Sequence, residues 1–212
     1  MTIFAEKGAY NLNFLAHAFL SGPDHQVLIG NFVADSIKGK MIERYNDGVK
    51  KGVILHRAID AYTDQHEVVK NSVARLQPAF RRFSPVIADI YYDHFLAVHW
   101  KDYGSTELSE FSAKVYKILI RNFSKLPPRS KRILPWMIAQ NWLTGYANLH
   151  DLQRVFKGMS HRTSFDSGME NAVDFLRKNY QDFEDDFKLF FPDLMSKSDE
   201  VLKGLDAGSS GE

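Results

Sequence analysis

Pairs of polar side chains, four residues apart, interrupt two strongly apolar segments near the start of the chain. Asn13 and His17 lie in the first segment, and Asn31 and Asp35 lie in the second. Residues at this spacing share one face of a helix, and a helix that is apolar nearly all round is buried. Because an unpaired buried polar group costs on the order of 2–7 kcal/mol, these side chains need partners inside the fold.

Two further segments carry acids at the same spacing, namely His56, Asp60 and Asp64 in one and Asp89 and Asp93 in the other. Like charges four residues apart weaken a helix, so these carboxylates imply a nearby cation, either an arginine or a metal ion. Inward-facing pairs on four helices are typical of a metal site in the core of a bundle. Nitrogen and oxygen ligands without thiolates favour Mn, Mg, Fe or Zn, ions that promote hydrolysis.

Each pair also has an interpretation without chemistry. His17 alone is better explained as a hydrogen-bonded core histidine than as a ligand, and Asp35 could form an ion pair with Arg57. Asp89 could meet Arg81 or an adjacent arginine in the same way. Taken singly, these structural interpretations are favoured, because ion-pair networks also perturb titratable groups. The recurrence on four helices favours the metal site, although spacing says nothing about its substrate.

The elements that must position these side chains are helices, because apolar residues recur with helical periodicity and strand-like alternation is scarce. The pattern predicts helices over residues 9–20, 24–39, 47–63, 67–82, 84–100, 105–124 and 130–146, with two or three more in 150–204. Pro135 should kink the seventh of these or mark its true start. We expect an all-α fold, a single helical bundle over residues 1–206, followed by a flexible Gly/Ser-rich tail over 207–212.

The composition excludes several functional classes. The 212 residues are 44% hydrophobic, which is typical of a globular protein, and include no cysteine, so disulfides, thiolate ligands and a cysteine nucleophile are absent. No apolar stretch reaches the roughly 20 residues that span a bilayer, and the N-terminus lacks the features of a signal peptide. We therefore expect a cytoplasmic protein without a membrane partner. A net charge of +1 and the absence of a recognisable motif argue against nucleic-acid binding.

Charge is nevertheless distributed unevenly. Residues 111–150 contain no Asp or Glu but carry a run of bases, namely Lys114, Lys117, Arg121, Lys125, Arg129, Lys131 and Arg132. One interpretation is a solvated face balanced by the acidic helices near the C-terminus, and composition alone favours it. The other is a surface on which positive potential steers the approach of an anionic partner.

Four motifs together resemble the acyl carrier protein phosphodiesterase family. They are Asn13-Phe-Leu-Ala-His17, Gly30-Asn-Phe-Val-Ala-Asp35, His56-Arg-Ala-Ile-Asp60-Ala-Tyr-Thr-Asp64 and Asp89-Ile-Tyr-Tyr-Asp93-His94. The resemblance extends from about residue 11 to about residue 195. It implies an HD-domain-like helical bundle, with a divalent metal site between its N-terminal helices. It also implies hydrolysis of the phosphodiester between 4'-phosphopantetheine and a serine of holo-acyl carrier protein, which yields apo-acyl carrier protein and 4'-phosphopantetheine.

Under this resemblance we expect one metal ligand from each inward-facing helix: His17, Asp35, His56 and Asp93. The metal is expected to be Mn, with Mg, Fe or Zn as alternatives. Asp60 is assigned as a fifth ligand or as the base that orients water, His94 as the proton donor to the leaving serine oxygen, and Arg57 as a phosphate ligand. Supporting roles fall to Asn13, Asn31, Asp64 and Asp89. The order Asp93-His94 departs from the His-Asp dyad of HD enzymes, so ligand roles are not copied from them.

The resemblance also gives the basic segment a partner, because acyl carrier proteins are strongly acidic. We expect docking along the segment from Lys114 to Arg132. Two other functions stay open. One is a metal-dependent phosphohydrolase that acts on another small phosphodiester or a nucleotide, and the other is a non-catalytic helical module that binds acidic proteins. The sequence leaves the oligomeric state undetermined.

Overall fold

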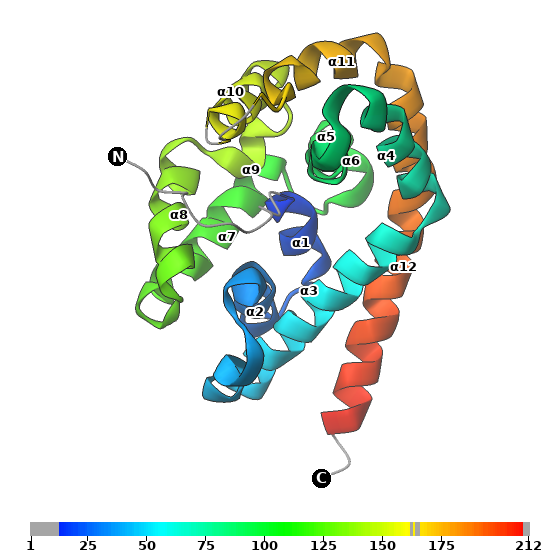
Figure 1. The fold of residues 1–212 in the computed structure, drawn as a ribbon. Helices are drawn as coiled ribbons and strands as arrows, with labels where there is room; N and C mark the ends of the chain where they lie inside the picture. Colours follow the sequence, from blue (N-terminus) through cyan, green and yellow to red (C-terminus); the bar gives the residue numbers. More distant parts are fainter. Residues whose placement is uncertain (1–12, 162, 164–165, 210–212) are drawn as a thin grey trace.

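The computed structural model describes residues 13–161, 163 and 166–209, and the regular elements within these ranges are all helical (Figure 1). The all-α expectation is therefore confirmed. The first half of the chain contains α1 (Phe14–Leu20), α2 (His25–Val33), α3 (Asp47–Gln65), α4 (Glu67–Phe80), α5 (Ser84–Val98) and α6 (Trp100–Tyr103). The second half contains α7 (Leu108–Arg121), α8 (Pro128–Ala139), α9 (Trp142–Gly145), α10 (Leu149–Ser160), α11 (Ala172–Lys178) and α12 (Tyr180–Ser209).

Capping side chains fix where the site-bearing helices begin. The Asp24 carboxylate accepts a 2.7 Å hydrogen bond from the Gln26 amide at the start of α2, as the sequence predicts. Asn46 does the same for α3, where its side-chain oxygen accepts from the Val49 amide at 3.0 Å. The α-helix α2 is shorter than expected. It ends at Val33 and continues as a 3₁₀ turn over Ala34–Ser36.

The helix that contains Pro135 begins and ends at other residues than expected. Helix α8 begins at Pro128, whose missing amide proton costs nothing in a first turn, and Pro135 lies inside the helix. The chain breaks instead at Asn141, which adopts a left-handed conformation with φ of 46°. Asparagine tolerates this conformation better than most residues, so it separates α8 from α9.

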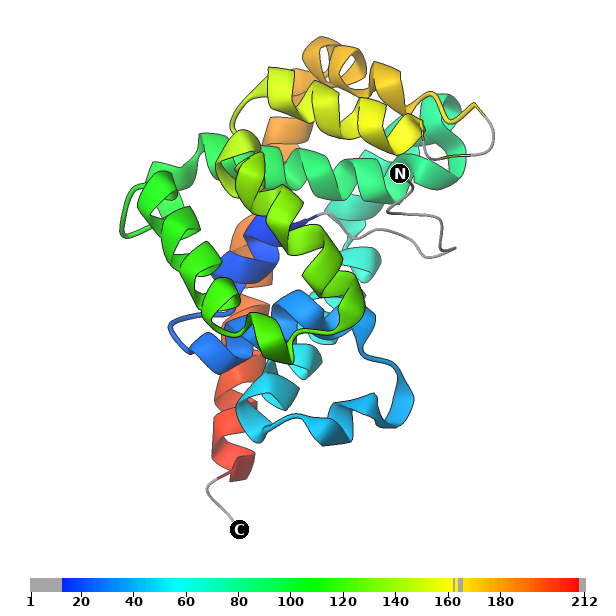
Figure 2. The same cartoon turned by 90° about the vertical axis from the view of Figure 1, so that its left-hand side faces the viewer.

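The helices around α1 form the framework of the site. Helix α3 lies against α2 on one side and the long helix α12 on the other, and α1 packs against α2 and α5 (Figure 1). In the perpendicular view, α7 and α8 cross in front of α1 and α2 (Figure 2). Large aromatic side chains fill the space between α5 and α12, namely the fully buried Tyr91, Phe95, Phe183, Phe187 and Phe191. This core packs α5 against α12, and α5 in turn contacts α1.

Helices α2 and α3 cross unusually closely because a glycine from each lies at the contact. A Cβ atom on Gly30 would lie 2.0 Å from the Val49 carbonyl oxygen, and one on Gly52 would lie 2.1 Å from the Val27 carbonyl oxygen. Only glycine permits such an approach between backbones. The crossing places Asn31, the residue after Gly30, beside the side chains that follow Gly52 on α3.

The end of the chain differs from the expected tail. Residues 207–209, which the sequence assigns to that tail, continue α12, and residues 210–212 lie outside the described part. Among the described helices, none is both long enough and apolar enough to cross a membrane.

Candidate metal centre

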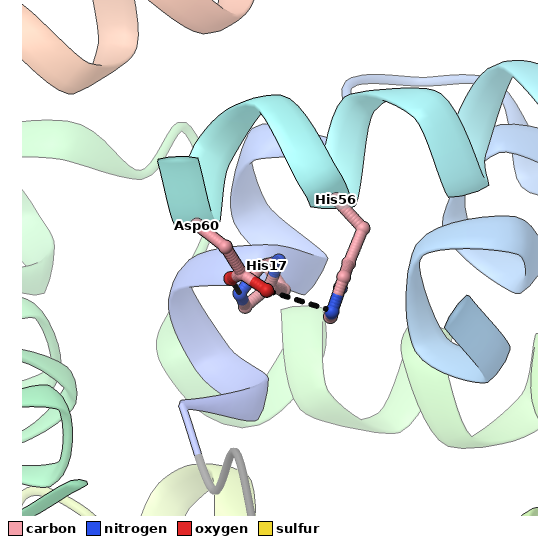
Figure 3. A group of neighbouring side chains, drawn as sticks. All are labelled: His17, His56 and Asp60. Atoms are coloured by element: carbon pink, nitrogen blue, oxygen red, sulfur yellow. Dashed lines mark ion pairs between the residues drawn. The ribbon is translucent and has the colours of Figure 1, made fainter. Parts of the chain in front are cut away.

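His17 from α1 meets His56 and Asp60 from α3 at one point (Figure 3). One ligand atom from each of the three side chains lies within 4.8 Å of the other two. The Nε2 atoms of His17 and His56 lie 3.2 Å and 3.3 Å from the two different oxygens of the Asp60 carboxylate. The imidazole rings stack with their centroids 4.2 Å apart. Three potential ligands from two helices therefore converge in a partly enclosed space.

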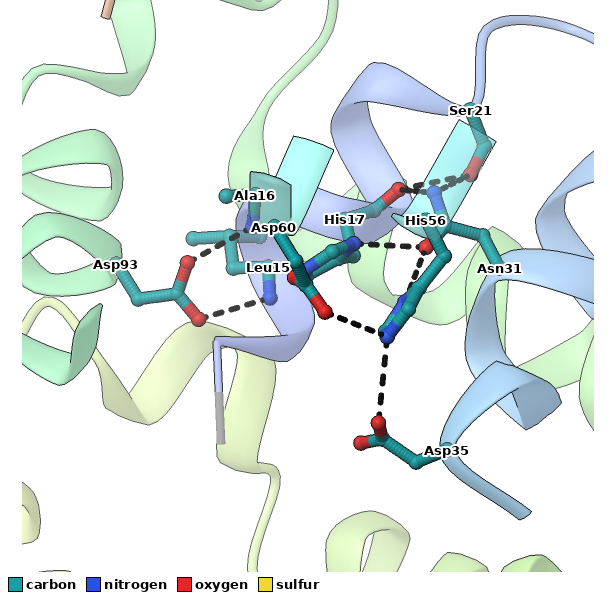
Figure 4. A network of polar contacts seen from close by, with 9 residues as sticks. All are labelled: Leu15, Ala16, His17, Ser21, Asn31, Asp35, His56, Asp60 and Asp93. Atoms are coloured by element: carbon teal, nitrogen blue, oxygen red, sulfur yellow. Dashed lines mark hydrogen bonds and ion pairs between the residues drawn. The ribbon is translucent and has the colours of Figure 1, made fainter. Parts of the chain in front are cut away.

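Asn31 on α2 orients both imidazoles (Figure 4). Its amide nitrogen donates to the His17 carbonyl oxygen at 2.9 Å and to the Ser21 hydroxyl at 3.0 Å, which fixes which way the amide faces. Its oxygen must then accept from Nδ1 of His17 at 2.7 Å and from Nδ1 of His56 at 2.9 Å. Protons on both Nδ1 atoms leave both Nε2 atoms to carry the lone pairs that a metal ion needs.

The second nitrogen of His17 supports this interpretation. His17 Nε2 is buried and forms no hydrogen bond with any described residue, although Asp60 Oδ1 lies 3.2 Å away. Buried polar atoms in proteins are almost always satisfied, so such a buried imidazole nitrogen beside a carboxylate fits a cation held between the two. The nitrogen and oxygen donors around it suit a divalent ion.

Electrostatics at the cluster follow from the pairing of its members. Burial opposes the charged form of His56, but hydrogen bonds to Asp35 and Asp60 outweigh it and raise the pKa of His56 to about 9. Burial, followed by the charge of His56, lowers the pKa of His17. Burial also opposes the charge of Asp60, yet both imidazoles hold its pKa well below its usual range. One imidazolium and one carboxylate thus share the site when no metal is bound.

Asp35 lies at the outer edge of this cluster. Its Oδ1 atom is 3.3 Å from Nε2 of His56, and about a third of its side chain is exposed. The 3₁₀ turn after α2 carries it into this position. It pairs with His56 and not with Arg57, which is exposed and forms no ion pair with any described residue. Asp35 can therefore act as a further ligand or hold water beside the cluster.

Asp93 lies on the far side of α1 from the histidines (Figure 4). Its two carboxylate oxygens accept hydrogen bonds from the backbone amides of Leu15 at 2.9 Å and Ala16 at 2.8 Å. The side chain is fully buried, and this burial raises the pKa of Asp93 to about 8 despite those hydrogen bonds. The structure does not bring Asp93 to the metal cluster but places it as the cap of α1, because Asn13 makes no capping hydrogen bond.

His94 makes its contacts in the core, and Arg57 is exposed. His94 Nδ1 is 2.7 Å from the Tyr146 carbonyl oxygen, and its Nε2 is 3.0 Å from the Tyr180 hydroxyl. Both ring nitrogens are thus engaged in the core, which leaves no lone pair or proton for a substrate. Arg57 projects from the exposed side of α3.

Two further carboxyl groups, Asp64 and Asp89, interact electrostatically with Asp60. Burial, followed by the charges of Asp60, Asp93 and Asp64, raises the pKa of Asp89 well above its usual value. Asp64 is exposed, and its pKa is raised by burial and by Asp60. Asp89, one helical turn before Asp93 on α5, is therefore the residue of α5 whose ionisation depends on the charge of Asp60.

Asn13, the remaining residue with an expected supporting role, lines a cleft beside His17.

Sequence reasoning missed one member of the hydrogen-bond network. The Ser21 hydroxyl donates to the His17 carbonyl oxygen at 2.7 Å and accepts from Asn31. Its sequence neighbours Gly22 and Pro23 suggested only a helix stop. The signal that could have identified it is its position four residues after His17, on the same face of the helix.

The fold and the site define a class of all-helical proteins with a candidate centre of nitrogen and oxygen donors held between the N-terminal helices. The profile of the family described as acyl carrier protein phosphodiesterase matches residues 12–194. The chain belongs to this family.

Relatives named acyl carrier protein phosphodiesterase cover nearly the same length. The relative from Serratia proteamaculans is 29% identical over 88% of this chain and 97% of its own. Those from Photorhabdus laumondii and Pectobacterium atrosepticum are 30% and 31% identical, over 89% and 87% of this chain and 96% of their own. No solved structure matches the chain.

Proposed function

We propose that the protein is an acyl carrier protein phosphodiesterase. It hydrolyses the phosphodiester between 4'-phosphopantetheine and the serine of holo-acyl carrier protein, and releases apo-acyl carrier protein and 4'-phosphopantetheine. The observation that carries this proposal is the family match over residues 12–194, which spans all three members of the histidine–carboxylate cluster.

We further propose that the reaction depends on a divalent metal ion, Mn first and Mg, Fe or Zn as alternatives. His17, His56 and Asp60 would hold the ion, because their ligand atoms converge and His17 Nε2 lacks a hydrogen bond among the described residues. Such an ion lowers the pKa of bound water and stabilises charge on phosphoryl oxygens. Asp35 would complete the ligand set or accept a proton from water, a role that its distance of 3.3 Å from His56 Nε2 and its partial exposure support.

The chain itself supplies orientation and charge. Asn31 keeps both imidazoles in the tautomer that presents Nε2. Asp93 fixes the start of α1, and so the position of His17 one turn later, which makes it a positioning residue. Because both ring nitrogens of His94 are engaged elsewhere, the proton for the serine oxygen has to come from water or from another side chain.

Carrier protein is proposed to dock on the outer side of α7 and α8. Lys114, Lys117 and Arg121 are exposed on α7, Lys125 on the 3₁₀ turn that follows it, and Arg132 on α8. The inner sides of the same two helices contribute Val115 and Met137 to the cleft beside the metal cluster. A partner attracted to the basic face is thus held close to the reacting groups.

The decisive experiment is mass spectrometry of holo-acyl carrier protein incubated with the purified protein and Mn. We expect loss of the 4'-phosphopantetheine mass from the carrier protein, and EDTA should abolish this loss. Asp60→Asn should be inactive while keeping the helical content of the wild type. Intact carrier protein with Mn, Mg, Fe and Zn alike would refute the proposed activity. Loss that persists in EDTA and in Asp60→Asn would refute the metal centre but not the activity.

A further inference from the structure

A small cleft opens directly beside the metal cluster, and its lining combines polar and apolar side chains. The polar ones are His17, Asn31, Asp35 and His56 at the cluster, together with Asn13. The other walls are apolar and come from α1, α2, α7, α8 and α9, including Ala18. A polar reaction site therefore continues into an apolar recess without a break.

The recess has a firm floor and an accessible rim. Val115, Leu119 and Leu143 on the floor are fully buried. Phe14 and Phe32 on the rim are only partly buried, and their ring centroids lie 5.8 Å apart. The Phe14 ring also contacts Trp142 at a centroid distance of 6.3 Å, so the rim is held in place by aromatic packing. A ligand group that enters here meets a preformed apolar wall.

The chemical group next to the phosphate ester determines which substrates fit this recess. Resting on the proposed function, the phosphate lies at the cluster of His17, His56 and Asp60. In 4'-phosphopantetheine the carbon that follows the ester methylene carries two methyl groups, so an apolar branched group lies directly beside the phosphate. A nucleotide has at the same position a ribose carbon without methyl groups, bonded to the ring oxygen and followed by two hydroxylated carbons, where pantetheine has one. The apolar walls would therefore leave more polar groups of the ribose without hydrogen-bond partners.

We propose that this cleft binds the dimethyl-branched part of the 4'-phosphopantetheine arm and thereby selects pantetheine phosphodiesters over nucleotide phosphodiesters. Ala18 is the smallest side chain that lines the cleft. It is partly buried and follows His17 directly on α1. A larger side chain there would occupy the space that the two methyl groups need.

Saturation-transfer NMR on 4'-phosphopantetheine tests the contact without relying on turnover. With wild-type protein and Mg, which does not broaden the spectrum, the two methyl signals should receive the strongest saturation and the methylenes beside the thiol the weakest. Ribose 5-phosphate serves as the comparison ligand and should show weak saturation throughout. Even saturation along the arm, or the strongest saturation at the thiol end, would overturn the proposal.

Substitution at Ala18 tests selectivity. Ala18→Leu should weaken binding of 4'-phosphopantetheine by about tenfold more than it weakens binding of inorganic phosphate, because a blocked methyl-sized space costs that much in an apolar pocket. The matched control is Ala74→Leu on the exposed side of α4, which should change neither affinity. Should Ala18→Leu fail to fold, Phe32→Ala removes a rim wall instead and should show the same selective loss. Equal loss for both ligands would overturn the assignment.

The outcomes separate this inference from the proposed function. If holo-acyl carrier protein is not hydrolysed but the methyl groups of 4'-phosphopantetheine are saturated, the activity is wrong and the cleft assignment stands. If holo-acyl carrier protein is hydrolysed while the methyl groups receive no preferential saturation, the activity stands and the cleft assignment is wrong.

Discussion

The carboxylate of Asp93 accepts a 2.9 Å hydrogen bond from the backbone amide of Leu15, 78 positions away in the sequence. Together with the amide of Ala16, this contact makes a side chain of α5 the cap of α1. The first amides of a helix have no partner within the helix, and here they are also buried. A residue whose type and spacing suggested a metal ligand therefore fixes the helix that carries His17.

Asp93→Ala should destabilise the protein by about 2–4 kcal/mol, because it leaves two buried amides without an acceptor. The free energy of unfolding, measured by urea denaturation in EDTA, checks this value. Metal affinity of the folded fraction should fall less than tenfold, since Asp93 does not reach the cluster. Asp199→Ala on the exposed side of α12 is the matched control and should be neutral. Complete loss of metal binding in a stable Asp93→Ala protein would restore Asp93 as a ligand.

Asn31→Leu should lower metal affinity by about 10–100-fold, the usual effect of removing a group that orients metal ligands. Its side-chain oxygen is the common acceptor for His17 and His56, so without it both imidazoles lose their fixed tautomer. Calorimetric titration with Mn measures the change. Asn71→Leu, on the exposed side of α4, should leave the affinity as it is. If the two variants bind Mn equally well, Asn31 does not orient the ligands.

Local patterns in the sequence predict most of the helices to within a few residues. Asp24 and the pair Ser84-Pro85 mark helix starts that the structure places at the same points. At Asp24 the signal works because a capping side chain acts on an amide two residues away. At Ser84 the hydroxyl donates to the Arg81 carbonyl oxygen instead, and the start is marked by the proline in the first turn. The interruption at Asn141 escapes such reasoning, since its left-handed conformation depends on how α9 packs.

The site is predictable in part for the same reason. Helical spacing alone puts His56 and Asp60 on one face of α3. It also puts Asp89 and Asp93 on one face of α5, but it cannot say which of them caps α1 and which interacts electrostatically with Asp60. One turn of helix, about 5.4 Å, separates the two, and the axial offset between α5 and α1 decides between them. That offset is a property of tertiary packing, which the sequence pattern does not contain.

Stability in EDTA should depend on pH through His56. The pKa of His56 rises from 6.5 to about 9 on folding. The contribution of its protonation to the free energy of unfolding is therefore fully present below pH 6.5 and is lost as the pH rises through 9. We expect His56→Gln to reduce the free energy of unfolding by up to about 3 kcal/mol near pH 6.5, with the difference from wild type shrinking towards pH 9. His150→Gln, at an exposed position, is the control. A difference that stays constant between pH 6.5 and pH 9 would contradict the raised pKa.

Gly52→Ala should destabilise the protein by about 1–3 kcal/mol or more and should weaken metal binding as well. The new methyl group would lie 2.1 Å from the Val27 carbonyl oxygen, so α2 and α3 must move apart. That movement separates Asn31 on α2 from His56 on α3. Thermal unfolding and Mn titration of the same sample measure both effects. Gly204→Ala on α12, where a methyl group would meet nothing within 4 Å, should be neutral or slightly stabilising.

Reversal of charge on the basic face should slow the capture of carrier protein without altering the chemical step. The test is the triple variant Lys117→Glu, Arg121→Glu and Arg132→Glu. We expect kcat/KM for holo-acyl carrier protein to fall by about tenfold or more, because the charges that steer the encounter are gone. For the same reason kcat/KM should depend less on salt concentration. The turnover at saturation, kcat, should stay near the wild-type value. A control with the same change in net charge reverses exposed lysines elsewhere, namely Lys101, Lys178 and Lys203. If the control slows capture as much as the triple variant does, net charge rather than the face of α7 and α8 governs encounter, and the docking surface lies elsewhere.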